Sequence, residues 1–359
     1  MPLVYHTSLP TFDRLRQDGQ EILSLDHALH QDIRELHIGF LNMMPDAALQ
    51  ATERQFMRLV GNCNQIAQFF VHLFSIPGLP HNAETQAYID KYYTTFEQVK
   101  ETGLDALIIT GANVSNPNLD QEEFWEPLQK VVTWATKNVT SVLCSCLSTH
   151  ALMKHLYQIE RQRLPQKRWG VYSHRVTQFK HPILRSINSR FDVPHSRYNA
   201  ITRDQFEAAG LTTLVAGREG DVHMAVSPDQ FRVVYFQGHP EYNYNSLLKE
   251  YQREVSQFIN GERSNYPPHP ENYFSPEAAD IADAYHQTVI DCQREGKPSP
   301  PFPMDQIDPY IDNTWGDTGK AVFNNWLGLI YQLTNIDRKL PFIEGVDPND
   351  PLRLLTNPE

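Results

Sequence analysis

Two cysteines lie where an apolar run gives way to a helix-like stretch. Residues 141–150 read SVLCSCLSTH, and the chain continues as ALMKHLY. The thiol of Cys146 would stand at the end of a strand and the start of a helix, where backbone N–H groups lower a thiol pKa and stabilise an oxyanion. We therefore predict that Cys146 is a nucleophile, and that Cys144, two residues earlier on the alternating strand, packs in the core.

A thiol nucleophile needs a base, and the base needs a group that orients it. The run RVVYFQGHPEY supplies both, because His239 follows an apolar run and Glu241 comes two residues later. Pro240 fixes the backbone between them, so both side chains can emerge at the same end of a sheet. Alone, a His-x-Glu pair fits a solvated loop; together with a thiol at a second strand end it predicts a catalytic triad.

The stretch TGANVSN follows the apolar run LDALII and places a glycine at a strand end. Gly111 would allow a ligand to approach the backbone closely. The N–H groups of Gly111 and Ala112, with that of Leu147, are therefore candidates for an oxyanion hole. A plain turn explains the same residues equally well.

Two further clusters, KRWGVYSH (167–174) and VPHSRYNAI (193–201), put cationic and hydroxyl groups beside strand-forming aromatic residues. Such groups suit a small zwitterion or carboxylate, although ordinary polar strand ends give the same pattern. We predict no metal site, because His239 and Glu241 lack a second spaced set of ligands.

These residues are carried by a regular alternation of elements. From about residue 35, short runs rich in Val, Ile, Leu and Phe alternate with amphipathic helical stretches, which predicts a doubly wound α/β domain with a mostly parallel sheet flanked by helices. After residue 170 the runs are shorter and closely spaced, which indicates added antiparallel strands. We expect an N-terminal extension over 1–34, a catalytic domain over 35–262, and a Pro-rich connection with a helical C-terminal extension over 263–359.

Bulk composition limits the partners. The 359 residues carry a net charge of −12, without the clustered Lys and Arg that a nucleic-acid surface requires. Four cysteines in no CxxC pair, and no secretory apolar segment at the start, argue against a disulfide framework and for the reducing cytoplasm. No apolar run approaches the ~20 residues that span a bilayer, so we expect a soluble protein.

The sequence resembles the homoserine O-succinyltransferases and O-acetyltransferases of methionine biosynthesis, which have a class I glutamine-amidotransferase-like (flavodoxin-like) fold. The resemblance runs from about residue 35 to 260 through FLNMMPDAALQATERQFMRLVGN, TGANVSN, VTSVLCSCLSTHA, VPHSRY and FQGHPEYNYNSLLKEYQRE, and NNWLGLIYQLT is similar to the family's C-terminal end. It implies that Cys146, His239 and Glu241 are catalytic and that Lys167, Ser196 and Arg253 bind substrate. It also implies a homodimer that acts on L-homoserine and an acyl-CoA co-substrate, with no bound cofactor.

The chain departs from the family at two places. Leu147, Ser148, Thr149 and His150 follow the nucleophile, where family members usually have Trp and small residues. The roles of Thr149 and His150 are left open. Ser115 occupies the position where members that use acetyl-CoA have Glu and members that use succinyl-CoA have Gly. A serine is small and neutral and would not repel the succinyl carboxylate, so we predict the succinyl donor and an acyl-cysteine intermediate.

Other functions fit parts of the pattern. Acetyl-CoA remains an alternative donor, and serine, one methylene shorter, an alternative acceptor. A glutamine amidotransferase would use the same Cys and His-Pro-Glu, but CSCLS lacks the glycines that those enzymes place around the nucleophile. A homologue that binds without catalysis is the third alternative, allowed by the unusual LSTH segment.

Overall fold

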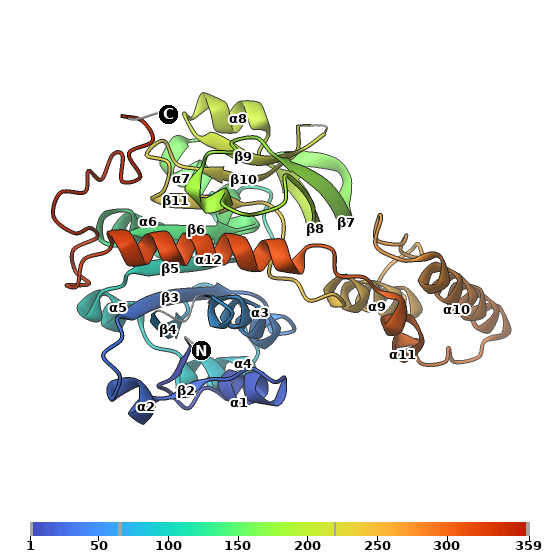
Figure 1. Cartoon of the computed structure of the whole chain (residues 1–359). Helices are drawn as coiled ribbons and strands as arrows, with labels where there is room; N and C mark the ends of the chain where they lie inside the picture. The colour runs from blue at the N-terminus through green and yellow to red at the C-terminus, as the bar shows by residue number, and fades with distance from the viewer. Residues whose placement is uncertain (1–2, 64–66, 219, 357–359) are drawn as a thin grey trace.

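The computed structural model describes residues 3–63, 67–218 and 220–356 (Figure 1). A sheet of nine strands, in the order β4-β3-β5-β6-β11-β10-β9-β7-β8, runs through these residues. Its strands are β3 (Glu35–Met43), β4 (Gln68–Phe74), β5 (Ala106–Ala112), β6 (Ser141–Ser145), β7 (Gln162–Val176), β8 (Arg190–Ala200), β9 (Thr212–Gly217), β10 (Val222–Val226) and β11 (Val233–Phe236). A separate parallel pair joins β1 (Val4–Tyr5) to β2 (Leu23–Ser24).

The first half of the sheet, from β4 to β11, is parallel, and the second half, from β11 to β8, is antiparallel. The α/β fold with a large sheet flanked by helices is therefore confirmed, with an antiparallel half as wide as the parallel one. One strand differs from the expectation: we grouped the run RVVYFQ with the antiparallel strands, but β11 also pairs in parallel with β6. That pairing sets Phe236 beside Ser145, so both strands end at the same level.

Helices cover both faces of the sheet. They are α1 (Pro10–Gln17), α2 (Leu25–Leu29), α3 (Leu49–Gly61), α4 (Ala83–Tyr92), α5 (Phe96–Thr102), α6 (Trp125–Asn138), α7 (Leu147–Tyr157), α8 (Arg203–Ala208), α9 (Ser246–Ile259), α10 (Pro276–Glu295), α11 (Met304–Ile307) and α12 (Gly316–Leu333). Short 3-10 helices are η1 (Leu119–Gln121), η2 (Pro182–Leu184) and η3 (Asp308–Tyr310). None of these helices is long and apolar enough to cross a membrane.

Strand alternation divides the core between the two faces. On one face, Phe40 and Leu143 pack with Phe56 of α3 and Trp326 of α12, all buried. On the other face, the neighbouring strand residues, including Cys144, pack with α6 and α7. Figure 1 shows α12 lying across the sheet, so a C-terminal helix completes the core on that face.

Helices α9, α10 and α11 form a lobe beside the ends of β7 and β8 (Figure 1). Trp169 and Val171 of β7 share its core with Leu248 and Tyr251 of α9. The long helix α10 has clear ends: the Ser275 Oγ accepts from the Ala278 N–H, Pro276 takes the first helical position, and Gly296 closes the helix at a φ of +66°. The lobe thus holds the outer strands that carry the predicted substrate-binding residues.

Candidate active site

Cys146 lies on the turn between β6 and α7 in a backbone conformation that side chains rarely adopt. Its φ is +56° and its ψ is −110°, although it is not a glycine. Such a conformation costs about 1–3 kcal/mol and persists only where surrounding contacts impose it. Strained strand-to-helix turns of this kind hold a nucleophile out from the end of a sheet. The sequence placed Cys146 at this turn but did not predict the strain.

Hydroxyl groups of the unusual LSTH segment hold this turn in place. The Ser148 Oγ accepts from the Ser145 N–H at 2.8 Å and lies 2.9 Å from the Ile109 carbonyl on β5. The Thr149 hydroxyl donates to the Phe236 carbonyl on β11 at 2.7 Å, and the Cys146 N–H donates to the same oxygen at 2.8 Å. The hydroxyl groups of Ser148 and Thr149 therefore hold the turn against β5 and β11, and we call this pair the clamp. Thr149, whose role the sequence left open, is part of it.

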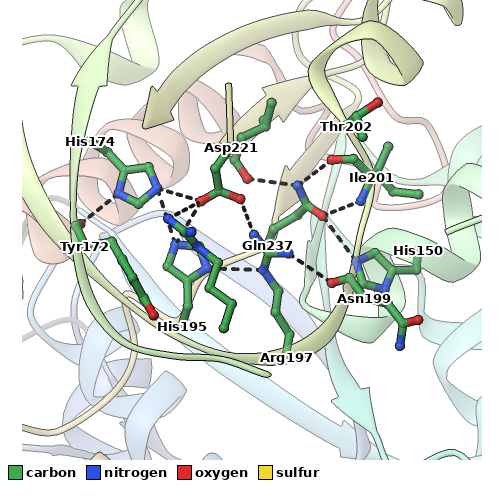
Figure 2. Close-up of polar contacts among 12 residues, drawn as sticks. His150, Tyr172, His174, His195, Arg197, Asn199, Ile201, Thr202, Asp221 and Gln237 are labelled. Atoms are coloured by element: carbon green, nitrogen blue, oxygen red, sulfur yellow. Dashed lines mark hydrogen bonds and ion pairs between the residues drawn. The ribbon is translucent and has the colours of Figure 1, made fainter. Parts of the chain in front are cut away.

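His150 belongs to the core and not to a pocket wall. It is 2% exposed, and its Nε2 lies 3.2 Å from the Gln237 Oε1, which also accepts from the Ile201 N–H. Burial lowers the pKa of His150 to about 3, helped by the charges of Arg197 and Arg161. His150 is therefore neutral at physiological pH and donates its Nε2 proton to Gln237 (Figure 2).

The two thiols are not equivalent. Cys144 is 0% exposed, donates to the Val234 carbonyl at 3.4 Å, and has a pKa raised to about 12 by burial. Cys146 is partly exposed. A buried thiol with a raised pKa is inert, whereas an accessible thiol beside a cation can react. The structure agrees with the distinction that the sequence predicted.

His239 and Glu241 follow β11 and form a buried pair. The His239 Nδ1 donates to the Glu241 Oε1 at 2.7 Å, and the second carboxylate oxygen has no hydrogen-bond partner among the described residues. Burial lowers the pKa of His239, but the negative charges of Glu241 and Cys146, and hydrogen bonds with both, outweigh it and raise the pKa well above its usual value. The contact with Cys146 brings the three predicted catalytic residues together.

The backbone beside His239 is fixed from β8. The His239 N–H donates to the Pro194 carbonyl at 2.8 Å, and the Tyr242 ring stacks on the imidazole with 4.3 Å between ring centres. A Cβ added at Gly238 would overlap the Val193 side chain and lie 3.0 Å from the His195 Nε2. Only a glycine fits at position 238, because the turn after β11 lies too close to β8 to leave room for a side chain.

A buried polar network holds His195 in that position (Figure 2). Arg197 donates its Nε–H to the His195 Nδ1 at 3.3 Å and pairs with Asp221, which also pairs with Arg168 at 3.0 Å. Burial alone would raise the pKa of Asp221, but the hydrogen bond with His174 and the charges of Arg197 and Arg168 lower it to about 2. The carboxylate is therefore ionised and doubly paired.

Among the described residues, His174, His195 and Asp221 are close enough to hold a metal ion, with their ligand atoms within 4.8 Å of one another. The hydrogen bonds oppose that use. His195 accepts at Nδ1, so in its neutral form the proton sits on Nε2 and blocks coordination. Two guanidinium groups already neutralise Asp221. The network is structural, and no spacing in the sequence would have identified it.

Two of the three predicted oxyanion donors lie beside the nucleophile. A Cβ on Gly111 would lie 3.7 Å from the Cys146 Cβ and 3.8 Å from the Leu147 nitrogen, so the end of β5 adjoins Cys146. As the first residue of α7, Leu147 has an N–H with no acceptor within its own helix.

Lys167 and Ser196 lie on β7 and β8 and are both anchored to α9. Lys167 pairs with Glu254 at 2.6 Å, and the Ser196 hydroxyl donates to Glu250 at 2.6 Å. Trp169 and Tyr242 also donate to Glu250, at 3.0 and 2.8 Å. The two carboxylates, one helical turn apart, join the predicted substrate residues to the ring that stacks on His239. Glu250 and Glu254 are four residues apart, a spacing that puts two side chains on one face of a helix. We missed this signal in the sequence.

Arg253 and Ser115 are both exposed. Arg253 makes no hydrogen bond or ion pair within the described part of the chain. Ser115 lies on the loop after β5, where its N–H and that of Asn116 both donate to Glu122 at 2.7 Å. The structure does not bring Arg253 into contact with the catalytic residues, and the loop of Ser115 is fixed through Glu122.

The fold and the site together define a class, that of α/β proteins with a cysteine on a strand-to-helix turn beside a buried His–Glu pair. The family model for homoserine O-succinyltransferase matches residues 2–336. Homoserine O-succinyltransferases of Methylobacter tundripaludum and Methylococcus capsulatus are 61% and 58% identical over 99% of this chain and 100% of each relative. The chain belongs to the homoserine O-succinyltransferase family.

Solved structures give only a weak likeness. A glutamine amidotransferase from Thermotoga maritima aligns with a TM-score of 0.44 at 10% identity, over 84% of this chain and 99% of that one. One from Methylobacillus flagellatus aligns with a TM-score of 0.45 at 11% identity, over 83% and 95%. We base the fold on the sheet order and not on these alignments.

Proposed function

We propose that this protein transfers the succinyl group of succinyl-CoA to the hydroxyl of L-homoserine through an acyl-cysteine intermediate. Family membership supports the reaction, and the contact of the Cys146 thiol with the His239–Glu241 pair is the observation that supports the mechanism. Because the charge of Glu241 raises the pKa of His239 well above its usual value, the imidazole can act as the base that takes the proton of the Cys146 thiol.

In the first step, the Cys146 thiolate attacks the thioester carbon of succinyl-CoA. The carbonyl oxygen becomes an oxyanion facing the N–H groups of Leu147, Gly111 and Ala112. The tetrahedral intermediate collapses, the bond to the CoA sulfur breaks, and the imidazolium of His239 gives its proton to the departing thiolate. The products are CoA, a succinyl thioester on Cys146 and a neutral His239.

In the second step, the neutral imidazole acts as the base. Acylation has removed the negative charge of Cys146 that helped to raise the pKa of His239. The ring therefore stays neutral after it has protonated CoA, as a base must be. His239 takes the proton of the homoserine hydroxyl as its oxygen attacks the thioester, and Cys146 leaves as the thiolate. The thiolate–imidazolium pair is restored, and Glu241 keeps the ring oriented throughout.

Homoserine is a zwitterion, and the three predicted binding residues offer complementary groups. Arg253 has an exposed guanidinium without an ion-pair partner in the described ranges, which suits the carboxylate. Ser196 offers a hydroxyl, and Lys167 lies above the Trp169 ring at 4.1 Å while paired with Glu254. Ser115 is too small to fill the space of a succinyl chain and brings no negative charge to it.

The direct test crosses succinyl-CoA and acetyl-CoA with homoserine and serine, and measures kcat/KM for each pair. We expect succinyl-CoA with homoserine to be preferred by at least tenfold. A clear preference for acetyl-CoA, or for serine, would contradict the donor or the acceptor that we propose. A glutaminase assay separates the amidotransferase alternative, and no turnover with any pair would favour the non-catalytic one.

The remaining parts of this proposal concern the protein's surroundings. We infer that it uses acyl-CoA as a co-substrate without a bound cofactor, works in the cytoplasm and forms a homodimer. The dimer rests on the family resemblance alone. Light scattering after size-exclusion chromatography tests it, and a mass of one chain at micromolar concentration would contradict it.

A further inference from the structure

We propose that Arg161 binds the distal carboxylate of the succinyl donor and thereby selects succinyl-CoA over uncharged acyl-CoAs. This inference rests on the proposed function and adds a residue that recognises the donor. Arg161 lies between the end of α7 and the start of β7 and is half-buried. A half-buried guanidinium needs hydrogen-bond acceptors, and the N–H groups that the protein's own acceptors leave free can bind a ligand.

Arg161 is held by the donor loop, the segment 111–118 that carries Ser115. Its Nη2 donates to the carbonyls of Asn116 and Pro117 at 3.3 and 3.1 Å. The same loop begins at Gly111, which adjoins the Cys146 Cβ. One short loop thus connects the nucleophile with the guanidinium, and Ser115 is the residue next to the contact.

Two of the three nitrogens of the Arg161 guanidinium make no contact that would prevent them from binding a ligand in the described part of the chain. Within the described ranges, the Nε and Nη1 groups of Arg161 make no hydrogen bond and the side chain makes no ion pair. Neither nitrogen is among the buried polar atoms without a partner, so both remain accessible. The Nη1 N–H groups of this planar cation can donate charge-assisted hydrogen bonds to a carboxylate oxygen.

Neighbouring acids do not neutralise this cation, because each has a closer partner. Glu122 accepts from the N–H groups of Ser115 and Asn116, both at 2.7 Å. Glu160 pairs with Lys154 at 2.8 Å. Burial lowers the pKa of Arg161, and the charges of Glu122, Glu160 and Cys146 oppose that effect. The geometric link to the nucleophile is the donor loop, which starts beside the Cys146 Cβ and includes the carbonyl that Arg161 contacts.

A succinyl group on Cys146 carries its second carboxylate two methylenes beyond the thioester. The carboxylate of homoserine has other cations available, because Lys167 and Arg253 lie on the side of β7 and α9. Arg161 instead contacts the donor loop. The two anionic groups of the reaction are therefore recognised by different cations.

The test compares succinyl-CoA with butyryl-CoA, whose acyl chain has the same number of carbons but ends in a methyl group. For Arg161→Gln, we expect kcat/KM with succinyl-CoA to fall on the order of 100-fold and that with butyryl-CoA to stay within about twofold. Arg161→Lys should lose less with succinyl-CoA, because it keeps the charge. Arg163→Gln is the matched control, because it removes the same charge two residues away. Arg163 is exposed and lies over the Tyr198 ring at 4.6 Å.

Equal losses with both donors would assign Arg161 to loop structure alone and overturn the proposal. So would an unchanged rate with succinyl-CoA, or a rise confined to the KM of homoserine. These results differ from a failure of the proposed function, in which the wild-type protein itself would not transfer a succinyl group to homoserine.

Discussion

Cys146 combines a reactive thiol with a backbone conformation that favours glycine. At a φ of +56° and a ψ of −110°, a Cβ is strained whatever the side chain does. We predict that Cys146→Gly is more stable than Cys146→Ala by about 1 kcal/mol, while both lose acyl transfer. Denaturant unfolding measures the difference. Cys144 is the control, since it lies in a regular strand where Gly should be less stable than Ala; the same order at both positions would contradict the strain.

The charge of Glu241 is the main influence that raises the pKa of His239 against the effect of burial. In Glu241→Gln that charge is lost, so the pKa of His239 falls and the ring becomes a weaker base toward the Cys146 thiol. We expect the rate of Cys146 alkylation by iodoacetamide at pH 7 to fall by about tenfold. Cys292, partly exposed and on α10, is an internal control whose alkylation should not change. An unchanged rate at Cys146 would show that Glu241 does not act on the thiol through His239.

At the scale of elements, β8 and the turn after β11 act as one unit, because Gly238 leaves no room between them. In Gly238→Ala the new methyl group displaces Val193 or His195, and with them the Pro194 carbonyl that holds the His239 N–H. We predict that kcat falls by at least tenfold and that the rate of Cys146 alkylation at pH 7 falls with it. Gly328→Ala in α12, where nothing lies within 4 Å of the added carbon, should leave both unchanged. Normal kcat in Gly238→Ala would refute the coupling.

The elements also show what the sequence could predict. The runs that became β3, β5 and β6, and the helices α3, α6 and α7, follow from local periodicity, because each buries one face or both. The candidate catalytic residues follow from their types at strand ends. The parallel pairing of β11 with β6 does not, since it joins residues about 90 positions apart and depends on the whole sheet.

The contacts that position the site were also beyond the sequence. The clamp of Ser148 and Thr149, the paired carboxylates of α9 and the network around Asp221 each join residues far apart in the chain. Ser, Glu and Asp are common surface residues, so their types alone give no signal. Their burial is what distinguishes them, and burial is known only once the elements are assembled.

At the scale of the whole molecule, buried histidines make the fold sensitive to acid. Burial lowers the pKa of His150 to about 3 and of His181 to about 4, and it holds those of His195 and His223 well below the usual value. Between pH 6.5 and about 4 the unfolded chain binds protons at these positions and the native protein does not. Stability is therefore lost as the pH falls, by up to about 1.4 kcal/mol per pH unit for each histidine.

Urea unfolding at pH 7, 6 and 5 measures this dependence. In His150→Gln, which can still donate to Gln237, the free energy of unfolding should fall less between pH 6 and 5. The difference is up to about 1.4 kcal/mol, because one proton fewer is bound on unfolding. A stability that is flat from pH 7 to 5 would contradict the neutral, buried state of these side chains.

The central claim is that Cys146 carries the acyl group. Intact and peptide mass spectrometry after mixing the protein with succinyl-CoA, without homoserine, tests it most directly. We predict the added mass of one succinyl group on the peptide that contains Cys146, its disappearance when homoserine is added, and no adduct in Cys146→Ala. Full succinyl transfer by Cys146→Ala, or an adduct confined to another residue, would contradict the mechanism.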